Sequence, residues 1–203
     1  KDRYTDCFIY LENSYLIDKI KELPLDTKVK IHPFNIEKNI ASIVVDKYTP
    51  DAYKNLYNSN KNLNITIIGF GNLGYSIFME ILQMNVFLNM KRLKITLIDK
   101  DIQKKKMKFF SRYNHISELF DIKTVEYDHF LQDSDQLILP NLDLCFTCIQ
   151  DQMENDYISK KVYRYYKDNK KEPKIVQIIY KMDKLEKTIL SDSIKKENKE
   201  LNM

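Results

Sequence analysis

The sequence predicts an α/β protein with a Rossmann-like, doubly wound parallel sheet, preceded by a partial βαβα unit. Three observations lead to this fold class: short apolar runs without polar alternation, helical patterns between those runs, and a Gly-x-Gly-x-x-Gly turn at Gly69 to Gly74. Uniformly apolar runs are typical of strands that are buried on both faces, as in a parallel sheet. Strands and helices that alternate along the chain predict βαβ units.

The main domain is expected over residues 64–183, with its elements in alternating order. Four short apolar runs predict strands: Ile65 to Ile68, Ile95 to Ile98, Leu144 to Ile149, and Ile175 to Tyr180. Ile122 to Tyr127 predicts a weaker strand. Helices are predicted from Leu73 to Leu88, where apolar residues recur every three or four positions, and over Ile102 to Tyr113 and Met153 to Asp168. The polar residues 184–203 are expected to fray into solvent as a tail.

Residues 1–50 repeat this pattern on a smaller scale. They predict strands over Cys7 to Leu11 and Lys28 to His32, and helices over Ser14 to Leu23 and Ile36 to Lys47. The segment Tyr48-Thr-Pro-Asp51 predicts the end of the second helix, and the Asn-rich residues 51–63 are interpreted as a linker.

The start of the chain is similar to the end of the main domain. Cys7-Phe8 matches Cys145-Phe146, and Tyr15 matches Tyr157 after a gap of about one helical turn. Two interpretations stay open: a duplicated unit, of which residues 1–50 are the last part of an upstream copy, or an unrelated βαβα segment. The chain begins at Lys1 without a signal peptide, so we expect a piece of a longer protein.

Composition and charge narrow the classes of function. The net charge of +4, from 33 basic and 29 acidic residues, is spread along the chain, which argues against a nucleic-acid partner. The segment Ile65 to Leu88 has a single charge, Glu80, but three glycines, two asparagines and a glutamine interrupt it. A strand, turn and helix explain this segment better than a membrane span does.

Cysteines and histidines indicate no metal site. Three cysteines without a secretory signal predict reduced thiols and a cytoplasmic location. Cys145 and Cys148 form a C-x-x-C sequence, but on a strand residues three apart point to opposite faces, so the two sulfurs are not expected to meet. His32, His115 and His129 have no ligand spacing and are interpreted as incidental.

The glycine turn is the strongest functional signal. The chain has three glycines, where average usage gives about fourteen, and all three lie in Gly69-Phe-Gly-Asn-Leu-Gly74. In a dinucleotide-binding turn Gly69 permits the tight exit from the strand, Gly71 lets the backbone approach a pyrophosphate, and Gly74 lets the helix pack on the sheet. A helix that begins near Asn72 offers N–H groups to phosphates, with Phe70 and Leu73 in the same turn. The alternative is a plain strand-to-helix turn.

A carboxylate ends the second strand of the main domain. Asp99 lies 25 to 30 residues after the glycines, and it is placed to accept hydrogen bonds from ribose hydroxyls. It would repel a 2′-phosphate, so NAD(H) or a plain adenine nucleotide is favoured over NADP(H). Lys100 belongs to the same candidate site. The alternative is a helix N-cap, for which Asp101 is the better candidate, and the basic run Lys104 to Lys108 is interpreted as a solvated helix face.

These segments resemble the regulator-of-potassium-conductance family, also called RCK or TrkA-N domains. The resemblance covers about residues 64–181 and consists of Ile65-Thr-Ile-Ile-Gly-Phe-Gly-Asn-Leu-Gly74, Ile95-Thr-Leu-Ile-Asp99 with Asp101, and Asp143-Leu-Cys-Phe-Thr-Cys-Ile-Gln150. The segment Lys28 to Pro50 is similar to the end of such a domain.

The resemblance implies a regulatory domain that binds NAD(H) or ATP/ADP and couples that binding to a potassium channel or transporter. It also implies a homo-oligomer or a tandem copy. Carried over by position, the three glycines of the turn hold the phosphates and Asp99 holds the ribose. The family often has Gly-Asp after its third strand, where this chain has Tyr127-Asp128, so Asp128 matches and the glycine does not.

Three functions are weighed. A non-catalytic nucleotide sensor is preferred, because it needs no catalytic group and none is evident. An NAD-dependent oxidoreductase needs a substrate domain, and about twenty residues follow the last predicted strand. An adenylating enzyme of the ubiquitin-activating type matches Thr96-Leu-Ile-Asp-Lys-Asp101, but Lys104-Lys-Lys-Met-Lys108 replaces the Asn-Arg-Gln run expected there.

Overall fold

The computed structural model describes most of the chain between Thr5 and Ile179. The described residues are 5–12, 16, 19–20, 28–57, 63–88, 93–111, 113, 116, 120–132, 142–168 and 174–179. The polar tail expected over 184–203 lies outside them, as does most of the helix expected over Ser14 to Leu23, of which only residues 16, 19 and 20 are described.

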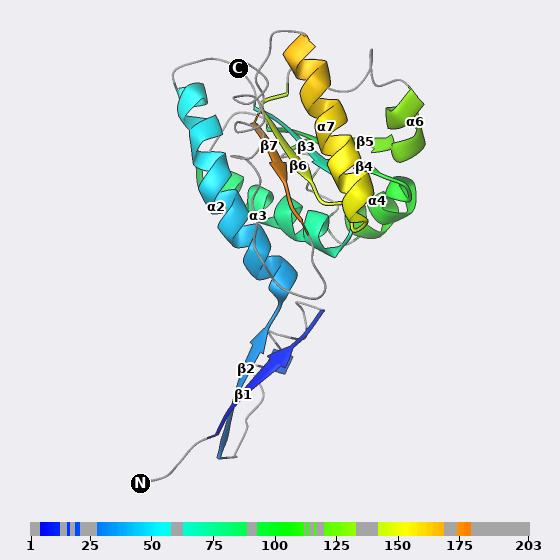
Figure 1. Ribbon diagram of the computed structural model, residues 1–203. Coiled ribbons are helices and arrows are strands. Elements are labelled where there is room, and N and C mark those ends of the chain that lie inside the picture. Colours follow the sequence, from blue (N-terminus) through cyan, green and yellow to red (C-terminus); the bar gives the residue numbers. More distant parts are fainter. Residues whose placement is uncertain are drawn as a thin grey trace, which may run out of the picture.

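A five-stranded parallel sheet forms the centre of the main domain (Figure 1). Its strands are β3 (Asn64–Ile68), β4 (Lys94–Asp99), β5 (Asp121–Glu126), β6 (Leu144–Thr147) and β7 (Lys174–Gln177). They lie in the order β5-β4-β3-β6-β7, so the direction of winding reverses beside β3. The predicted Rossmann-like, doubly wound sheet is therefore confirmed. Its switch point lies between the neighbouring strands β3 and β6, whose chain connections run in opposite directions.

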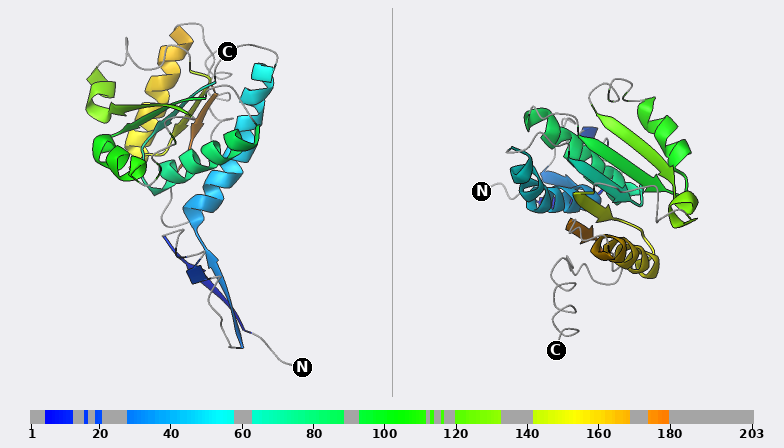
Figure 2. Two further views of the ribbon diagram at one scale, coloured as in Figure 1. Left: turned by 180° about the vertical axis from the view of Figure 1, so that it is seen from behind. Right: turned by 90° about the horizontal axis from the view of Figure 1, so that it is seen from above.

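Helices cover both faces of this sheet (Figure 2). On one face lie α2 (Ile36–Tyr57), α3 (Asn72–Leu88) and α4 (Ile102–Phe110). On the other lie α6 (Tyr127–Gln132) and α7 (Gln152–Asp168). The strands feed alternate side chains to the two cores, since Ile67 packs with the first group and Ile68 with the second. Within the described residues, no helix combines the length and the apolar character needed to cross a membrane.

The helix expected to end at Lys47 continues to Tyr57, so that prediction was wrong. Pro50 removes one helical hydrogen bond, but the residues before it form a continuous apolar stripe. Ala41, Val44 and Tyr48 are buried in the core shared with α3. Burial of this stripe outweighs the lost bond, and residues 51–57 of the segment interpreted as a linker therefore lie in α2.

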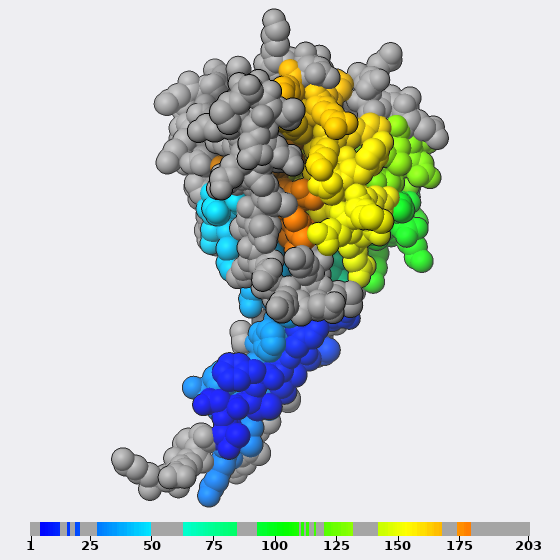
Figure 3. Space-filling view, viewed as in Figure 1, coloured from blue at the N-terminus to red at the C-terminus, as the bar shows by residue number. Residues whose placement is uncertain are grey.

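A second, two-stranded parallel sheet precedes α2. It pairs β1 (Thr5–Tyr10) with β2 (Val29–Phe34), and it projects away from the main domain (Figures 1 and 3). Phe8 is 70% exposed. Parallel sheets are usually covered on both faces, but within the described residues this sheet is not, whereas α2, which follows it, packs in the core of the main domain.

Candidate functional site

The glycine turn lies at the carboxyl end of β3, against its two neighbouring strands. The N–H of Gly69 donates to the carbonyl of Ile98 at 2.9 Å, and the N–H of Cys148 donates to the carbonyl of Ile68 at 2.7 Å. Gly69 has a φ of +90°, and a Cβ there would lie 2.8 Å from the carbonyl carbon of Cys148. The backbone conformation and the neighbouring strand thus both require glycine at this position.

The other two glycines differ from each other in what the fold requires. Gly74 is buried in the first turn of α3, where a Cβ would collide with the carbonyl oxygen of Gly69. Gly71 is exposed, its φ lies outside the left-handed region, and a Cβ there would meet nothing within 4 Å. The fold therefore requires glycine at 69 and 74 but leaves space for a side chain at 71.

The remaining residues of the turn divide between the core and solvent. Phe70 and Leu73 are buried, and the ring of Phe70 packs edge-on against Phe78 at 5.5 Å between centroids. Asn72 is exposed as the first residue of α3. Thus Gly71 and Asn72 form the exposed part of the turn, at the N-terminus of a helix whose free N–H groups can bind an anion.

Asp99 binds the turn itself. Its Oδ2 accepts a hydrogen bond from the N–H of Phe70 at 2.7 Å, and its Oδ1 accepts from the N–H of Asp101 at 2.9 Å. The ammonium of Lys105 lies 2.5 Å from the same Oδ1. Burial alone would raise the pKa of Asp99, but these hydrogen bonds and the charge of Lys105 outweigh it and hold the pKa below its ordinary value.

This arrangement changes the interpretation of three predicted positions. The carboxylate expected to face a ribose also ties β4 to the glycine turn, and its charge is already paired with Lys105. Lys105 is half-buried, so the basic run is not a purely solvated face. Asp101 occupies the N-cap position of α4, but its side chain makes no capping hydrogen bond, in contrast to the expected cap.

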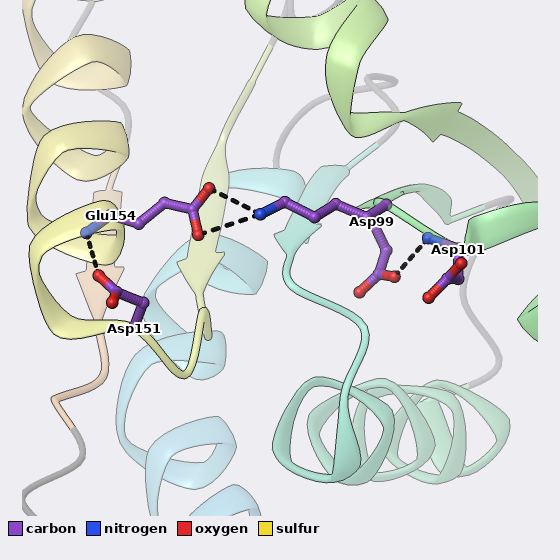
Figure 4. A network of polar contacts seen from close by, with 5 residues as sticks. Asp99, Asp101, Asp151 and Glu154 are labelled. Carbon is purple, nitrogen blue, oxygen red and sulfur yellow. Dashed lines mark hydrogen bonds and ion pairs between the residues drawn. The ribbon is translucent and has the colours of Figure 1, made fainter.

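Lys100 connects the end of β4 with the first turn of α7 (Figure 4). Its ammonium lies 3.1 Å from Oε1 of Glu154 and 3.4 Å from Oε2. The ammonium also lies 5.2 Å from the ring centroid of Tyr127. Burial, followed by a hydrogen bond to Glu154, raises the pKa of Tyr127 above its ordinary value. Since β3 lies between β4 and β6 in the sheet, the Lys100–Glu154 pair spans the end of the central strand.

The start of α7 is fixed by two polar residues that the sequence reasoning missed. Asp151 caps the helix, because its Oδ1 accepts from the N–H of Glu154 at 2.8 Å (Figure 4). Asn155 is buried, donates to the carbonyl of Ile178 at 2.8 Å and accepts from the N–H of Ile149 at 3.2 Å. The spacing Asp151-x-x-Glu154 matches a capping box and would have located the helix start and Glu154.

Asp128 lies apart from these contacts. It is exposed in the first turn of α6, directly after β5, the edge strand next to β4. The structure thus brings Asp99 into direct contact with the Gly69 to Gly74 turn, with Lys100 as the next residue of the chain, and it places Asp128 one strand further along the same edge.

The thiols and imidazoles do not form a metal site in the described part of the chain. Cys145 packs in the core beneath α7 and Cys148 in the core beneath α3, so the two sulfurs occupy opposite faces, as expected. Burial raises the pKa of the Cys145 thiol to about 12. Among the described residues no group of three or more His, Cys, Asp or Glu side chains could hold a metal ion.

The two histidines that the structure describes lie in different elements. His32 stacks on Phe8 at 4.8 Å between centroids and its Nε2 lies 2.7 Å from Asp6 in the β1–β2 sheet. His129 is exposed on α6, and His115 lies outside the described residues.

Comparisons with known proteins add no assignment. No family model, no curated protein and no solved structure matches this chain.

Proposed function

We propose that this chain binds a nucleotide at the Gly69–Gly74 turn and acts as a non-catalytic regulatory domain. The proposed ligand is NAD(H), with ATP or ADP as the second possibility, and the proposed partner is a potassium channel or transporter. The topology supports this position for the site, because ligands of open α/β sheets bind outside the carboxyl ends of the strands at the switch point.

The observation that carries this proposal is the open space at Gly71. The chain uses glycine at only three positions, and at two of them the backbone leaves no room for any other residue. At Gly71 the fold makes no such demand, since a Cβ would meet nothing within 4 Å. A ligand that approaches the backbone closely gives a reason for glycine there, and a pyrophosphate at a helix N-terminus is such a ligand.

A regulatory role is supported by how the charged groups of the site are used. Asp99 holds the turn and pairs with Lys105, and Glu154 pairs with Lys100. Both carboxylates therefore have structural partners, and proton transfer to a substrate would require those contacts to break. The assignment to potassium transport rests on the sequence resemblance alone.

Assembly belongs to the same proposal. The β1–β2 sheet exposes Phe8, Tyr10 and Val29, and an isolated two-stranded sheet is marginally stable in water. Association with another copy of this chain, or with a tandem copy, would cover these side chains.

Thermal unfolding with added nucleotide tests the proposal. NADH, ATP and ADP are each added to the wild type and to Gly71→Val, whose side chain would occupy the space proposed for the phosphates. A ligand at a hundredfold excess over its Kd stabilises the native state by about 2.7 kcal/mol. We expect a raised Tm for the wild type only. Equal stabilisation of Gly71→Val would refute the turn as the site, and consumption of NADH on addition of small carbonyl compounds would contradict the non-catalytic role.

A further inference from the structure

Two lysines lie at the end of β4, the strand that contacts the glycine turn, and each is already paired with a carboxylate. Lys105 pairs with Asp99, and Lys100 pairs with Glu154. The end of β4 contacts the turn directly, because Ile98 and Asp99 accept hydrogen bonds from the first two N–H groups of the turn. A phosphate group bound at the turn would therefore meet ammonium groups that are not available without an exchange of partners.

The two pairs differ in how readily they can open. Asp99 has a side chain that is only 11% exposed and accepts three hydrogen bonds at 2.9 Å or less. The Lys100–Glu154 pair is more open to solvent, with side chains 64% and 29% exposed, and its two N···O distances are 3.1 and 3.4 Å. Exposed pairs of this kind contribute little to stability, whereas breaking a buried, hydrogen-bonded pair is costly. Lys100 is thus the ammonium that can leave its partner.

The position of Lys100 fits a phosphate ligand. Lys100 follows β4 and pairs with Glu154 of α7, which follows β6, so its partner comes from the other side of β3 in the strand order, and its flexible four-carbon stem can redirect the ammonium. Glu154 would keep two contacts after Lys100 leaves: the hydrogen bond with Tyr127 and the capping bond from its own N–H to Asp151. The start of α7 therefore does not depend on Lys100.

We propose that Glu154 competes internally with the diphosphate group of the ligand for Lys100. In the free protein Glu154 holds the lysine; when the adenosine diphosphate moiety shared by ADP and NAD(H) binds, its phosphates replace the carboxylate. This inference rests on the proposed function. It adds a device that lowers the affinity of the site and makes that affinity depend on the phosphates and not on the adenosine.

Calorimetric titration of ADP and of adenosine, at one ionic strength, tests the competition. Glu154→Gln removes the competing charge and retains a side chain that can hydrogen-bond to Tyr127. Lys100→Met removes the ammonium group that is proposed to bind the phosphates. Asp156→Asn is the matched control, because Asp156 is also an acid near the start of α7 and its ion pair, with Lys160 at 3.0 Å, lies within the helix. Thermal unfolding of each variant without ligand checks that the fold is kept.

The competition predicts that removing the carboxylate and removing the ammonium of this one ion pair have opposite effects on the affinity for ADP. We expect Glu154→Gln to bind ADP about three- to fivefold more tightly than the wild type, the size of an exposed ion pair. Lys100→Met should bind ADP more weakly, and neither variant should bind adenosine differently. ADP binding by Glu154→Gln where the wild type binds none would also support the inference.

Other results separate the inference from the proposed function. If both variants shift ADP affinity in the same direction, or Glu154→Gln behaves as Asp156→Asn does, the competition is refuted. ADP binding to the wild type that Gly71→Val abolishes would then leave the proposed function standing. Absence of ADP binding in the wild type and in Glu154→Gln would overturn both.

Discussion

The three glycines of the turn should respond very differently to the same small substitution. Gly71→Ala adds a methyl group into open space, at a φ outside the left-handed region. We expect a free energy of unfolding that is unchanged or higher by about 0.4–1 kcal/mol, because alanine restricts the unfolded chain more than glycine does.

Gly69→Ala and Gly74→Ala should both destabilise the protein. At Gly69 the φ of +90° costs an L-residue about 1–2 kcal/mol. The new Cβ would also lie 2.8 Å from the carbonyl carbon and oxygen of Cys148. These are backbone atoms directly after β6, so they cannot rotate out of the way as a side chain can. At Gly74 the obstacle is the carbonyl oxygen of Gly69, so the turn must deform, at a cost of about 3 kcal/mol or more.

Urea unfolding followed by circular dichroism measures these differences. The three variants and the wild type should share one m-value, so that midpoints report stability directly. A loss in Gly71→Ala as large as that in Gly69→Ala would refute the reasoning, because all three glycines would then be explained by the backbone alone. The case for a ligand at Gly71 would disappear with it.

Three further predictions concern a charge, the thiols and assembly. Asp99→Asn should lower the free energy of unfolding by about 1–3 kcal/mol at pH 7. Because the native pKa of Asp99 is lowered, the stabilisation by its carboxylate is present above the unfolded pKa of about 3.9 and is lost as the pH falls further. Urea titrations at pH 7 and pH 3 should therefore show a smaller difference between the wild type and Asp99→Asn at pH 3. An unchanged difference at pH 3 would argue against the ionised carboxylate. Cys7, which is partly exposed, should react with a thiol reagent in the native protein, whereas Cys145 and Cys148 should react only after unfolding; three fast thiols would contradict their burial. Light scattering should give at least twice the 24.3 kDa of one chain, and Phe8→Glu should reduce that mass; a wild-type monomer at tens of micromolar would contradict association through the β1–β2 sheet.

The strands were the most predictable part of the fold. The apolar runs located four strands of the main sheet, with ends that differ by up to three residues, because a run buried on both faces has few other interpretations. The fifth strand, β5, was predicted more weakly because it lies at the edge of the sheet and has polar residues. The end of α2 was not predictable from the local sequence. Pro50 indicates that the helix stops, but the burial of Tyr48 against α3, a helix later in the sequence, favours its continuation. Local propensity cannot include a contact of that kind.

The candidate site was predictable in its backbone and not in its charges. The glycine pattern and the acid at the end of β4 follow from spacing, and the structure places them in contact. The partner of that acid, Lys105, was one of four lysines in a basic run. Only the fold shows which face of α4 is buried, and hence which of these lysines lies against Asp99. Lys100 and Glu154 are 54 residues apart, so their pairing depends on the order of the strands.

The length of α2 has a mechanical consequence. The side chain of Asn35 caps this helix at the N–H of Lys38 and donates to the carbonyl of Leu11 just after β1, so one side chain links the start of the helix to the small sheet. Further along, α2 packs on α3, which begins at the glycine turn. The contact with α3 lies around residues 41–48 of α2, so from its middle the helix extends about 13 Å back to Ile36 and β2 extends about 20 Å further, a lever arm of about 33 Å in all. A tilt of about 5° at that contact would therefore displace the far end of β2 by about 3 Å.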